Sequence, residues 1–291
     1  MTNPHVAMLG LGRMGSALAN RFVATGVPLT VWNRSPAKSF PFQGRATVAT
    51  SAAAACDMAD VVVLSLSDYS AGLEVLDEAS AACTLAGKTL LQLTSGAASD
   101  ARTMQVWANM HGMEYIDAAI VAYPNGVGTE AAMLFYAGAE EVWERHRETF
   151  THLGGMNRYL GDSIGAAATL ECAVLEYYYG ATLAMLHGAA LCNSENFPLT
   201  EYFYLVKALG PLLTGTADAS RTMISKGLYD GADCSLDVHV SAIRRIQRMS
   251  HDNGIDTRVP DAIMAAYKKA IAAGHSDAEI AALFETLATN S

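Results

Sequence analysis

Three glycines near the start of the chain constrain its fold more than any other feature. They stand as Gly10-x-Gly12-x-x-Gly15 in "MLGLGRMG", between an apolar run typical of a strand and a helical pattern that begins at Arg13. In a dinucleotide-binding turn the first glycine allows the tight turn, the second lets the backbone approach a pyrophosphate, and the third lets helix and strand pack closely. The N-terminus of the helix offers N–H groups to the phosphates. A tight structural turn is the alternative, but the strand-turn-helix context favours a phosphate-binding turn made of Gly10, Leu11, Gly12, Arg13, Met14 and Gly15.

The first half of the chain alternates short apolar runs with helical patterns. Several runs are continuously apolar, as expected for strands with helices on both faces of an open parallel sheet. The predicted strands are residues 5–11, 28–33, 60–67, 88–94, 114–122, 132–138 and 157–161, and the predicted helices between them are 13–25, 69–82, 99–111 and 140–153.

After Gly161 the strand pattern stops. A long apolar helix is expected over about 163–192, followed by helices at 199–213, 235–253, 259–273 and 277–289. The sequence therefore predicts an α/β Rossmann-type domain with a doubly wound parallel sheet, residues 1–161. A long interdomain helix leads from it into an all-α domain, residues 162–291.

The composition argues against nucleic acid as a partner and against a membrane span. A net charge of −10 argues against nucleic acid as a partner, because nucleic-acid binders carry basic patches. The longest apolar run is interrupted by Glu176, three tyrosines and His187, which favours a buried helix over a membrane span. The chain is 51% hydrophobic and 16% charged, which suggests buried surface beyond a monomer's own core.

The cysteines indicate a reducing compartment. There are five, widely spaced and without a CxxC pair, so we expect reduced, mostly packing residues in a cytoplasmic protein. The first residues enter a strand pattern without a charged segment and an apolar segment before it, so no signal peptide is expected. Neither an HExxH motif nor a Cys/His cluster predicts a metal site.

The end of the second predicted strand indicates which dinucleotide binds. NAD-binding domains place an Asp or Glu there to hold the ribose 2′-hydroxyl. This chain instead has "VWNRSPAK", with two cations and no carboxylate. A guanidinium can hold a 2′-phosphate through paired hydrogen bonds, so NADPH is favoured over NADH. A solvated basic loop is the alternative; the candidate contacts are Asn33, Arg34, Ser35 and Lys38.

Two further strand ends point into the same crevice, since ligands of open α/β sheets bind at the carboxyl ends of the strands. Small hydroxyl residues at these ends could meet ribose, phosphate or the nicotinamide amide, although they could equally be ordinary turn formers. The candidate residues at the two strand ends are Leu66 and Ser67 after the first, and Thr94 and Ser95 after the second.

The motifs "GLGRMG", "NRSPAK", "LTSG" and "GDSIGAAATLE", with the tail from Asn253, resemble the β-hydroxyacid dehydrogenase superfamily over nearly the whole chain. Within it, the chain is most similar to imine reductases and reductive aminases. The dehydrogenases carry a catalytic lysine six residues after a glycine of the interdomain helix, where imine reductases usually have an aspartate. Counting from Gly165 gives Glu171. The tyrosine that follows eight residues later in imine reductases is Tyr179 here, so the resemblance implies Glu171 and Tyr179 as catalytic residues.

The resemblance also implies a homodimer. In the family the long helix reaches into the neighbouring subunit, and each active site lies between the nucleotide domain of one chain and the helical domain of its partner. The apolar surplus of the composition fits this domain-swapped arrangement.

A glutamate in place of the lysine suits C=N rather than C=O chemistry. Carbonyl reduction builds negative charge on oxygen, which an ammonium stabilises, whereas an iminium is cationic and attracts a carboxylate. At about 4 Å and an effective dielectric constant of about 20 the attraction is about 4 kcal/mol before desolvation. Glu171 would hold the amine or iminium, or shuttle a proton if its surroundings raise its pKa; Tyr179 would donate a hydrogen bond or a proton to nitrogen.

Other interpretations of these side chains remain open. Glu171 could be an exposed helix residue, and Tyr179 could be core or dimer packing. Tyr178 lies closer than Tyr179 to the helix face of Glu171. His187 and His239 could face the cleft or be structural.

The predicted strand at 114–122 ends in an apolar segment. Hydroxyacid dehydrogenases resemble one another in a Ser-Gly-Gly turn here that holds the substrate carboxylate, whereas this chain has Ile120, Val121 and Ala122 followed by Tyr123-Pro124. We therefore expect an NADPH-dependent reductase of apolar imines, with reductive amination as a further candidate activity. The alternatives are a β-hydroxyacid dehydrogenase and a catalytically silent NADPH-binding protein.

Overall fold

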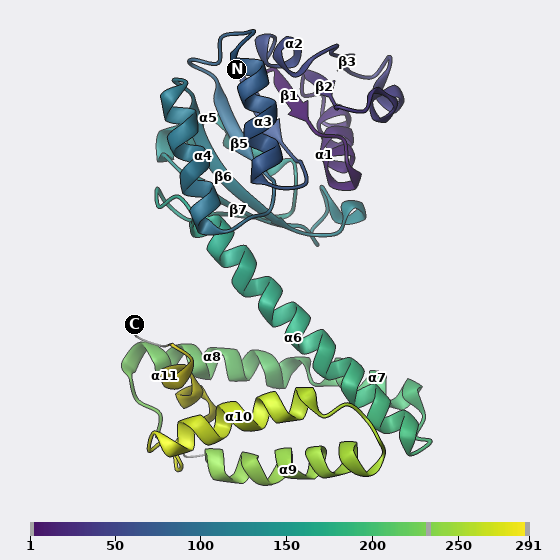
Figure 1. Cartoon of the computed structure of the whole chain (residues 1–291), viewed down its shortest axis with the longest axis vertical. Coiled ribbons are helices and arrows are strands. Elements are labelled where there is room, and N and C mark those ends of the chain that lie inside the picture. Colours follow the sequence, from purple (N-terminus) through teal and green to yellow (C-terminus); the bar gives the residue numbers. More distant parts are fainter. Residues whose placement is uncertain (1–2, 231–233, 289–291) are drawn as a thin grey trace. The chain divides into compact units, whose positions relative to one another are not determined.

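The computed structural model describes residues 3–230 and 234–288 of the chain (Figure 1). These residues form two compact units, Met1–Glu176 and Tyr177–Ser291. A single helix, α6 (Ala166–Ser194), runs from the first unit into the second. Among the described residues, no helix is both long and apolar enough to span a membrane.

The first unit is built on an eight-stranded sheet in the order β3-β2-β1-β4-β5-β6-β7-β8. All neighbouring strands are parallel except β6 and β7. Residues 122–132 join these two strands and contain only a short 3₁₀ turn, η2 (Pro124–Gly126), and an antiparallel pair needs no crossover helix. The predicted parallel sheet is thus confirmed apart from this pair; its strands are β1 (Val6–Leu9), β2 (Leu29–Trp32), β3 (Thr47–Val48), β4 (Val61–Leu64), β5 (Thr89–Gln92), β6 (Glu114–Val121), β7 (Met133–Gly138) and β8 (Met156–Tyr159).

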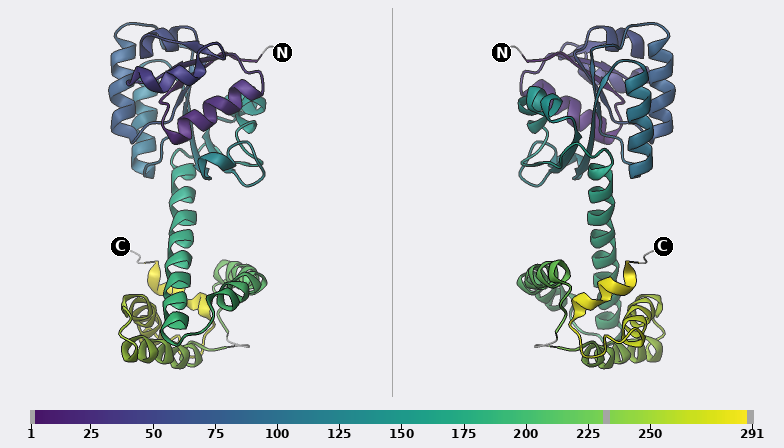
Figure 2. Two further views of the ribbon diagram at one scale, coloured as in Figure 1. Left: turned by 90° about the vertical axis from the view of Figure 1, so that its right-hand side faces the viewer. Right: turned by 90° about the vertical axis from the view of Figure 1, so that its left-hand side faces the viewer.

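Helices cover both faces of the sheet, which gives each strand two buried faces. One core joins the strands to α1 (Arg13–Ala24) and α5 (Glu140–Thr151) through side chains such as Phe22 and Phe150. The other joins them to α2 (Ala52–Asp57), α3 (Tyr69–Ser80) and α4 (Ala98–Met110). Figure 2 shows α1 in purple on one side of the sheet and the blue helices on the other.

Three short elements between β2 and β4 were missed by the sequence prediction. The 3₁₀ helix η1 (Pro36–Phe42) contains two prolines, β3 has only two residues, and α2 is six residues long. The hydroxyl of Ser51 caps α2 by accepting a hydrogen bond from the Ala54 backbone at 3.0 Å. None of these elements is long enough to produce a readable periodicity.

The second unit is helical, as predicted, with different boundaries. The predicted helix at 199–213 is two helices, α7 (Leu199–Ala208) and α8 (Gly210–Lys226), because Pro211 starts a new helix and has no N–H to continue the previous one. The helices α9 (Leu236–Asp252) and α10 (Arg258–Ala272) follow. The predicted helix at 277–289 is a 3₁₀ turn, η3 (Ile280–Ala282), and α11 (Leu283–Leu287), and its last predicted residue, Thr289, lies outside the described residues.

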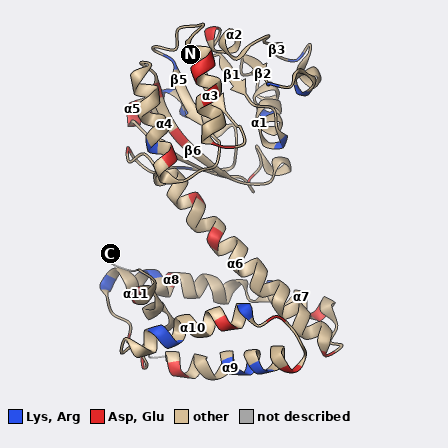
Figure 3. Ribbon diagram, viewed as in Figure 1, with Lys and Arg blue, Asp and Glu red and all other residues tan. Residues whose placement is uncertain are grey.

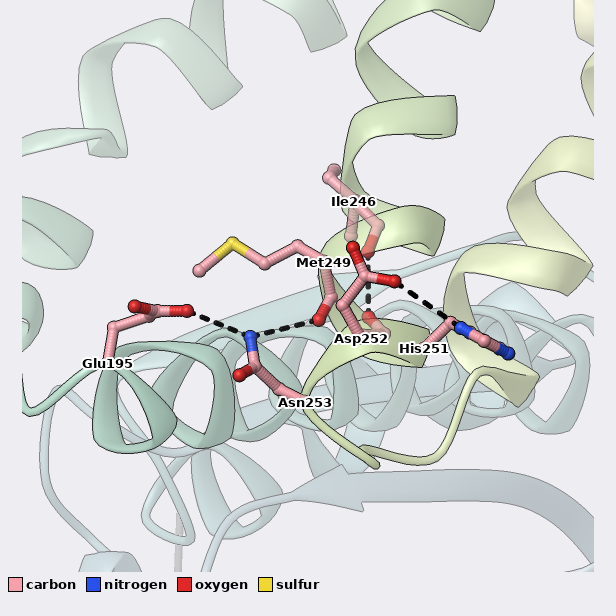
Figure 4. Close-up of polar contacts among 7 residues, drawn as sticks. Glu195, Ile246, Met249, His251, Asp252 and Asn253 are labelled. Atoms are coloured by element: carbon pink, nitrogen blue, oxygen red, sulfur yellow. Dashed lines mark hydrogen bonds and ion pairs between the residues drawn. The ribbon is translucent and has the colours of Figure 1, made fainter.

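Two small clusters hold the second unit together. Buried side chains of α9 and α10, among them Leu236, Ile243 and Tyr267, form the larger cluster. Tyr229, Ala281 and Ala282 form the smaller one. The carboxamide of Asn253 fixes the ends of α6 and α9 by donating hydrogen bonds to Glu195 at 2.9 Å and to the Met249 carbonyl at 3.1 Å (Figure 4). By contrast, α7 and α8 contain no buried residue.

Candidate active site

The glycine turn has the geometry that the sequence predicts. Gly10 follows β1 with a φ of +101°, and a Cβ atom there would lie 2.2 Å from the Ser65 carbonyl oxygen. A Cβ atom at Gly15 would lie 2.1 Å from the Gly10 carbonyl oxygen. Both positions therefore require glycine, the first for its positive φ and for space, the second so that α1 can approach β1.

Gly12 is different, because a Cβ atom there would meet no atom of the described residues within 4 Å. Gly12 is also the N-cap of α1, and within the described chain no side chain caps this helix and no acidic residue stands in its first turn. An open backbone and an uncapped helix N-terminus form a cradle for an anion. Leu11, Arg13 and Met14 complete the turn around this cradle.

At the end of β2, Asn33 has a structural role in addition to its predicted position at the cofactor. Its side-chain oxygen accepts a hydrogen bond from the Leu11 backbone at 2.9 Å, and its amide donates to the Ser35 carbonyl at 3.1 Å. The carboxamide thus ties the glycine turn to the loop that carries the two cations, Arg34 and Lys38.

Both cations are exposed. The guanidinium of Arg34 lies 3.5 Å from the Glu74 carboxylate, with both side chains about two-thirds exposed (67% and 64%). Such an exposed pair is weak, so it leaves Arg34 available to another anion. Arg34 and Asn33 line a cavity of about 650 Å³, together with Thr50 and Ser51.

The loops after β4 and β5 are tied to each other. The Leu66 backbone donates to the Thr94 hydroxyl at 3.0 Å, and the Thr94 backbone donates to the side-chain oxygen of Gln92 at 2.9 Å. Thr94 is buried, so its hydroxyl serves the loop, whereas Ser67 and Ser95 are exposed. Of the predicted strand-end hydroxyls, that of Ser95 is the one the structure joins to Glu171.

Glu171 belongs to the first unit and is 4% exposed. It is one of three buried residues of the 29-residue helix α6, with Ala167 and Ala168. Its carboxylate accepts a 2.8 Å hydrogen bond from the Ser95 hydroxyl. The exposed-residue interpretation of Glu171 is therefore wrong, whereas Glu176 is exposed. Figure 3 shows acidic bands on α6.

The surroundings of Glu171 favour its protonated form. Burial raises the pKa of Glu171 above its ordinary value, and the negative charge of Asp117 raises it further, while the hydrogen bond from Ser95 lowers it in part. A carboxyl group with a raised pKa at the carboxyl ends of the strands is a candidate proton donor.

Asp117, in β6, is a buried acid that the sequence interpretation missed. It is 1% exposed, and its Oδ1 accepts hydrogen bonds from the hydroxyls of Tyr69 at 2.7 Å and Tyr115 at 3.1 Å. Burial raises the pKa of Asp117, and the two phenols lower it in part. The available signal was an aspartate in the middle of the apolar strand "EYIDAAIV".

The tyrosines of α6 belong to the second unit and are exposed. Tyr177 is 63% exposed, Tyr178 45% and Tyr179 64%. The rings of Tyr178 and Tyr179 form an edge contact with centroids 5.4 Å apart. Core packing within the described chain therefore does not account for Tyr179, and its catalytic role stays a prediction.

The two histidines considered at the sequence level make local contacts in the second unit. Nε2 of His187 lies 3.0 Å from the Asp256 carbonyl oxygen and 3.4 Å from the Ser250 hydroxyl. The His239 ring lies edge-on to Tyr267, with centroids 5.8 Å apart. In the described part of the chain, no group of three or more His, Cys, Asp or Glu side chains is arranged to hold a metal ion.

Both parts of the chain match known protein families. Residues 5–161 match the family model described as the NAD binding domain of 6-phosphogluconate dehydrogenase, and residues 163–289 match the model described as NADPH-dependent reductive aminase-like, C-terminal domain. The chain is 30% identical to an NADPH-dependent reductive aminase of Aspergillus oryzae over 286 residues, 97% of this chain and 96% of the relative.

Solved structures of similar proteins have the same fold. An imine reductase from Myxococcus stipitatus, in complex with NADP⁺, superposes with a TM-score of 0.91 at 32% identity and covers 98% of this chain and 100% of its own. A reductive aminase from Aspergillus terreus, in complex with NADPH4, cyclohexanone and allyl amine, gives 0.89 at 29% identity, with the same coverage of 98% and 100%. By its sequence and its fold, the chain belongs to the family of NADPH-dependent imine reductases and reductive aminases.

Proposed function

We propose that this protein reduces the C=N bonds of apolar imines to amines with NADPH, including imines that form from a ketone and an amine. The observation that carries the proposal is the buried Glu171, bonded to Ser95 at the carboxyl end of β5. It occupies the helix position at which the carbonyl-reducing members of the superfamily carry a lysine. A group that is neutral or negative there favours a cationic acceptor over a developing alkoxide.

The residues present fit NADPH. The cradle at Gly12 and the N-terminus of α1 suit a pyrophosphate, and Gly10 and Gly15 keep the turn close to the sheet. Arg34 and Lys38 would hold the 2′-phosphate, with no carboxylate between them and Asn33. We assign Leu11, Arg13, Met14, Ser35, Leu66, Ser67, Thr94 and Ser95 to the remaining cofactor contacts. NADPH, when bound, supplies the hydride.

Glu171 provides the proton that an imine needs before it accepts a hydride. In its protonated form it would transfer the carboxyl proton to the imine nitrogen, which leaves a carboxylate beside an iminium. The two opposite charges attract while the carbon is still electron-poor. Once the carbon has received the hydride, the amine is neutral and the carboxylate can take up a proton from solvent. The Ser95 hydroxyl holds the acid in place throughout this cycle.

Tyr179 is the proposed second polar contact to the substrate nitrogen. Its side chain is exposed on α6, eight residues after Glu171. Eight residues advance two turns of the helix, so Tyr179 and Glu171 would line one cleft, which the helical domain of the partner subunit would complete in the arrangement that the family resemblance implies. There the Tyr179 hydroxyl would donate a hydrogen bond to nitrogen.

We infer a homodimer from the second unit. The helices α7 and α8 contain no buried residue, and α6 has none beyond Glu171. Large apolar side chains are nevertheless exposed on all three helices. An apolar face of this size is uncommon on a monomer, and a second copy of the same helices would cover it; its residues include Leu183, Leu186, Leu205, Leu209, Leu212 and Leu213.

The cysteines and the family models support two further proposals. All five cysteines are free, which agrees with a protein of the reducing cytoplasm. The boundary between the two matched models supports a division at residue 161, into a nucleotide-binding domain of residues 1–161 and a helical domain of residues 162–291. The compact units of the structure divide further along, within α6.

The proposed activity is tested by following NADPH absorbance with 1-pyrroline, and with cyclohexanone plus a primary amine. We expect turnover with both, and a higher rate with the preformed imine. The control is a set of β-hydroxyacids with NADP⁺ in the oxidative direction, for which we expect no turnover. Oxidation of the hydroxyacids would identify a β-hydroxyacid dehydrogenase, and NADPH binding without any turnover would identify a silent cofactor-binding protein.

A further inference from the structure

A buried group of three polar side chains lies next to Glu171 in the first unit. Asp117 is at its centre, on β6, and Tyr69 of α3 and Tyr115 of β6 both donate to its Oδ1. The other carboxyl oxygen, Oδ2, is buried and has no hydrogen-bond partner among the described residues. The burial of the Asp117 carboxyl group indicates a specific role, because removing a carboxyl group from water is costly.

The Asp117 carboxyl group faces the beginning of α6. The strand that carries Asp117 packs against the first turn of that helix through Ala119 and Ala167, and the backbone of Ala168 lowers the pKa of Asp117 in part. Residues three apart lie on one face of a helix, so Ala168 and Glu171 face the same side, and both are buried. Asp117, on β6, thus lies near the buried face of α6 that carries Glu171, and its negative charge raises the pKa of Glu171.

We propose that Asp117 is a positioning residue for the reaction at Glu171: its buried carboxyl group holds Tyr69 beneath the loop whose Ser95 bonds Glu171, and it places a second carboxyl group near Glu171. This inference rests on the proposed function of Glu171. Two neighbouring carboxyl groups in a poorly solvated place do not ionise independently, because the first charge disfavours the second. Tyr69 and Tyr115 donate to Asp117 and favour its ionised form, so we expect Glu171 to be the partner that carries the proton.

The other polar groups around Glu171 do not replace Asp117. Ser95, from the loop after β5, is a neutral donor. Asp100 of α4 is engaged by the Ala97 backbone at 2.9 Å, and Arg102 of α4 lies beside Gly165, where a Cβ atom would be 3.0 Å from its guanidinium. Burial and the charge of Asp117 raise the pKa of Tyr69 and of Tyr115, so both phenols stay neutral donors.

Small residues allow this arrangement. A Cβ atom at Gly96 would lie 2.5 Å from the Tyr69 ring, so glycine there lets the ring pass beneath the loop that carries Ser95. Ala167 and Ala168 let the first turn of α6 lie close to the sheet, where Ala167 packs with Ala119, Phe135 and Ala137. Tyr69 therefore packs beneath the loop of Ser95, and the start of α6 packs against β6 and β7 of the same sheet.

The test compares Asp117→Asn with Asp100→Asn, which removes a nearby carboxylate that does not act on Glu171. The pH dependence of kcat for 1-pyrroline is measured for both variants and for the wild type, and the limb due to Glu171 is the one that Glu171→Gln abolishes. We expect Asp117→Asn to move this limb to lower pH and to lower kcat several-fold on its alkaline side, with little change in NADPH affinity. Asp100→Asn should leave the limb in place. A limb that stays in place in Asp117→Asn, while its Tm falls, would reduce Asp117 to a structural residue.

A second measurement serves if Asp117→Asn does not fold, or if the protein does not turn over imines. Asp117→Ser also removes the charge of Asp117, and carboxyl C=O infrared bands, titrated without substrate, report the ionisation of Glu171 directly; the band of Glu171 is the one that Glu171→Gln abolishes. Because Glu171 ionises second, beside a charged Asp117, its midpoint should lie at lower pH in Asp117→Asn or Asp117→Ser than in the wild type. An unchanged Glu171 midpoint overturns the inference whether or not the enzyme is active, whereas a shifted midpoint in a protein without turnover rejects the proposed function and keeps the coupling.

Discussion

The hydroxyl of Ser95 donates a 2.8 Å hydrogen bond to the carboxylate of Glu171, which joins the loop after β5 to the start of α6. The bond links a residue at the carboxyl end of the sheet, where a dinucleotide presents its reactive ring, to an acid on the following helix. It therefore connects the proposed cofactor site to the proposed proton donor.

The raised pKa of Glu171 has a consequence for stability. A carboxyl group whose pKa is higher in the folded state contributes stability below its ordinary value of 4.5, and this contribution is lost as the pH rises through the folded pKa. Glu171→Gln removes the buried charge without changing the shape. We expect its Tm to exceed that of the wild type at about pH 8, and the difference to vanish near about pH 4. A difference in Tm that is the same at both pH values would contradict the assigned pKa direction.

Two substitutions in the glycine turn distinguish its role in cofactor binding from its role in folding. Gly12→Ala places a methyl group in the open cradle, where it contacts no protein atom, so we expect the Tm without cofactor to stay within a few degrees while NADPH affinity falls at least tenfold. Gly15→Ala is the matched control, because its Cβ would lie 2.1 Å from the Gly10 carbonyl oxygen and should destabilise the fold itself. Cofactor affinity is measured by quenching of protein fluorescence. Unchanged NADPH affinity in Gly12→Ala would place the pyrophosphate elsewhere.

The elements of the fold that the sequence predicts correctly are those with a strong local signal. The continuous apolar runs of β1 and β4, and the periodic α1 and α5, start within a residue of their predicted positions. The antiparallel β7 was not foreseen, because direction depends on whether residues 122–132 contain a crossover helix. The break at Leu209 was also missed, although Gly210-Pro211 marks it in the sequence.

Some residues of the candidate site could likewise be identified from the sequence, and others could not. Glu171 could be identified because the glycine-to-acid spacing from Gly165 is local and resembles a known family. The group of Asp117 with Tyr69 and Tyr115 could not be assembled from the sequence, since the first two are 48 residues apart. The hydroxyls of Thr94 and Ser95 are adjacent, yet one serves the loop and the other Glu171, a difference that only the backbone decides.

We predict that Arg34 and Lys38 decide the choice of cofactor. Replacing both by alanine removes charge-assisted hydrogen bonds to the 2′-phosphate, and we expect the KM for NADPH to rise about tenfold or more. The KM for NADH should change less than about twofold, since NADH has no 2′-phosphate. Steady-state kinetics with the two cofactors measures this. Parallel rises in both KM values would mean that the cations act on the loop and not on the phosphate.

The proposed homodimer would depend on the exposed apolar side chains of α8. Leu212→Asp places a charge on a side chain that is 65% exposed in the single chain, and we expect it to give monomers by light scattering and to abolish turnover. NADPH binding should remain, because the glycine turn lies in the first unit. Met110→Asp, at a 77% exposed position on α4, is the matched control and should leave the dimer and the rate unchanged. A wild-type chain that is monomeric and active would contradict the shared site.

The most direct test of the account is the turnover of Glu171→Gln with two acceptors, 1-pyrroline and its permanently cationic N-methyl iminium analogue. If Glu171 delivers the proton, kcat/KM for the neutral imine should fall about a hundredfold or more. The iminium needs no proton and should lose far less, and NADPH affinity should stay within about twofold because Glu171 is not a phosphate contact. Wild-type rates of imine reduction in Glu171→Gln, or equal losses with both acceptors, would contradict proton delivery by Glu171.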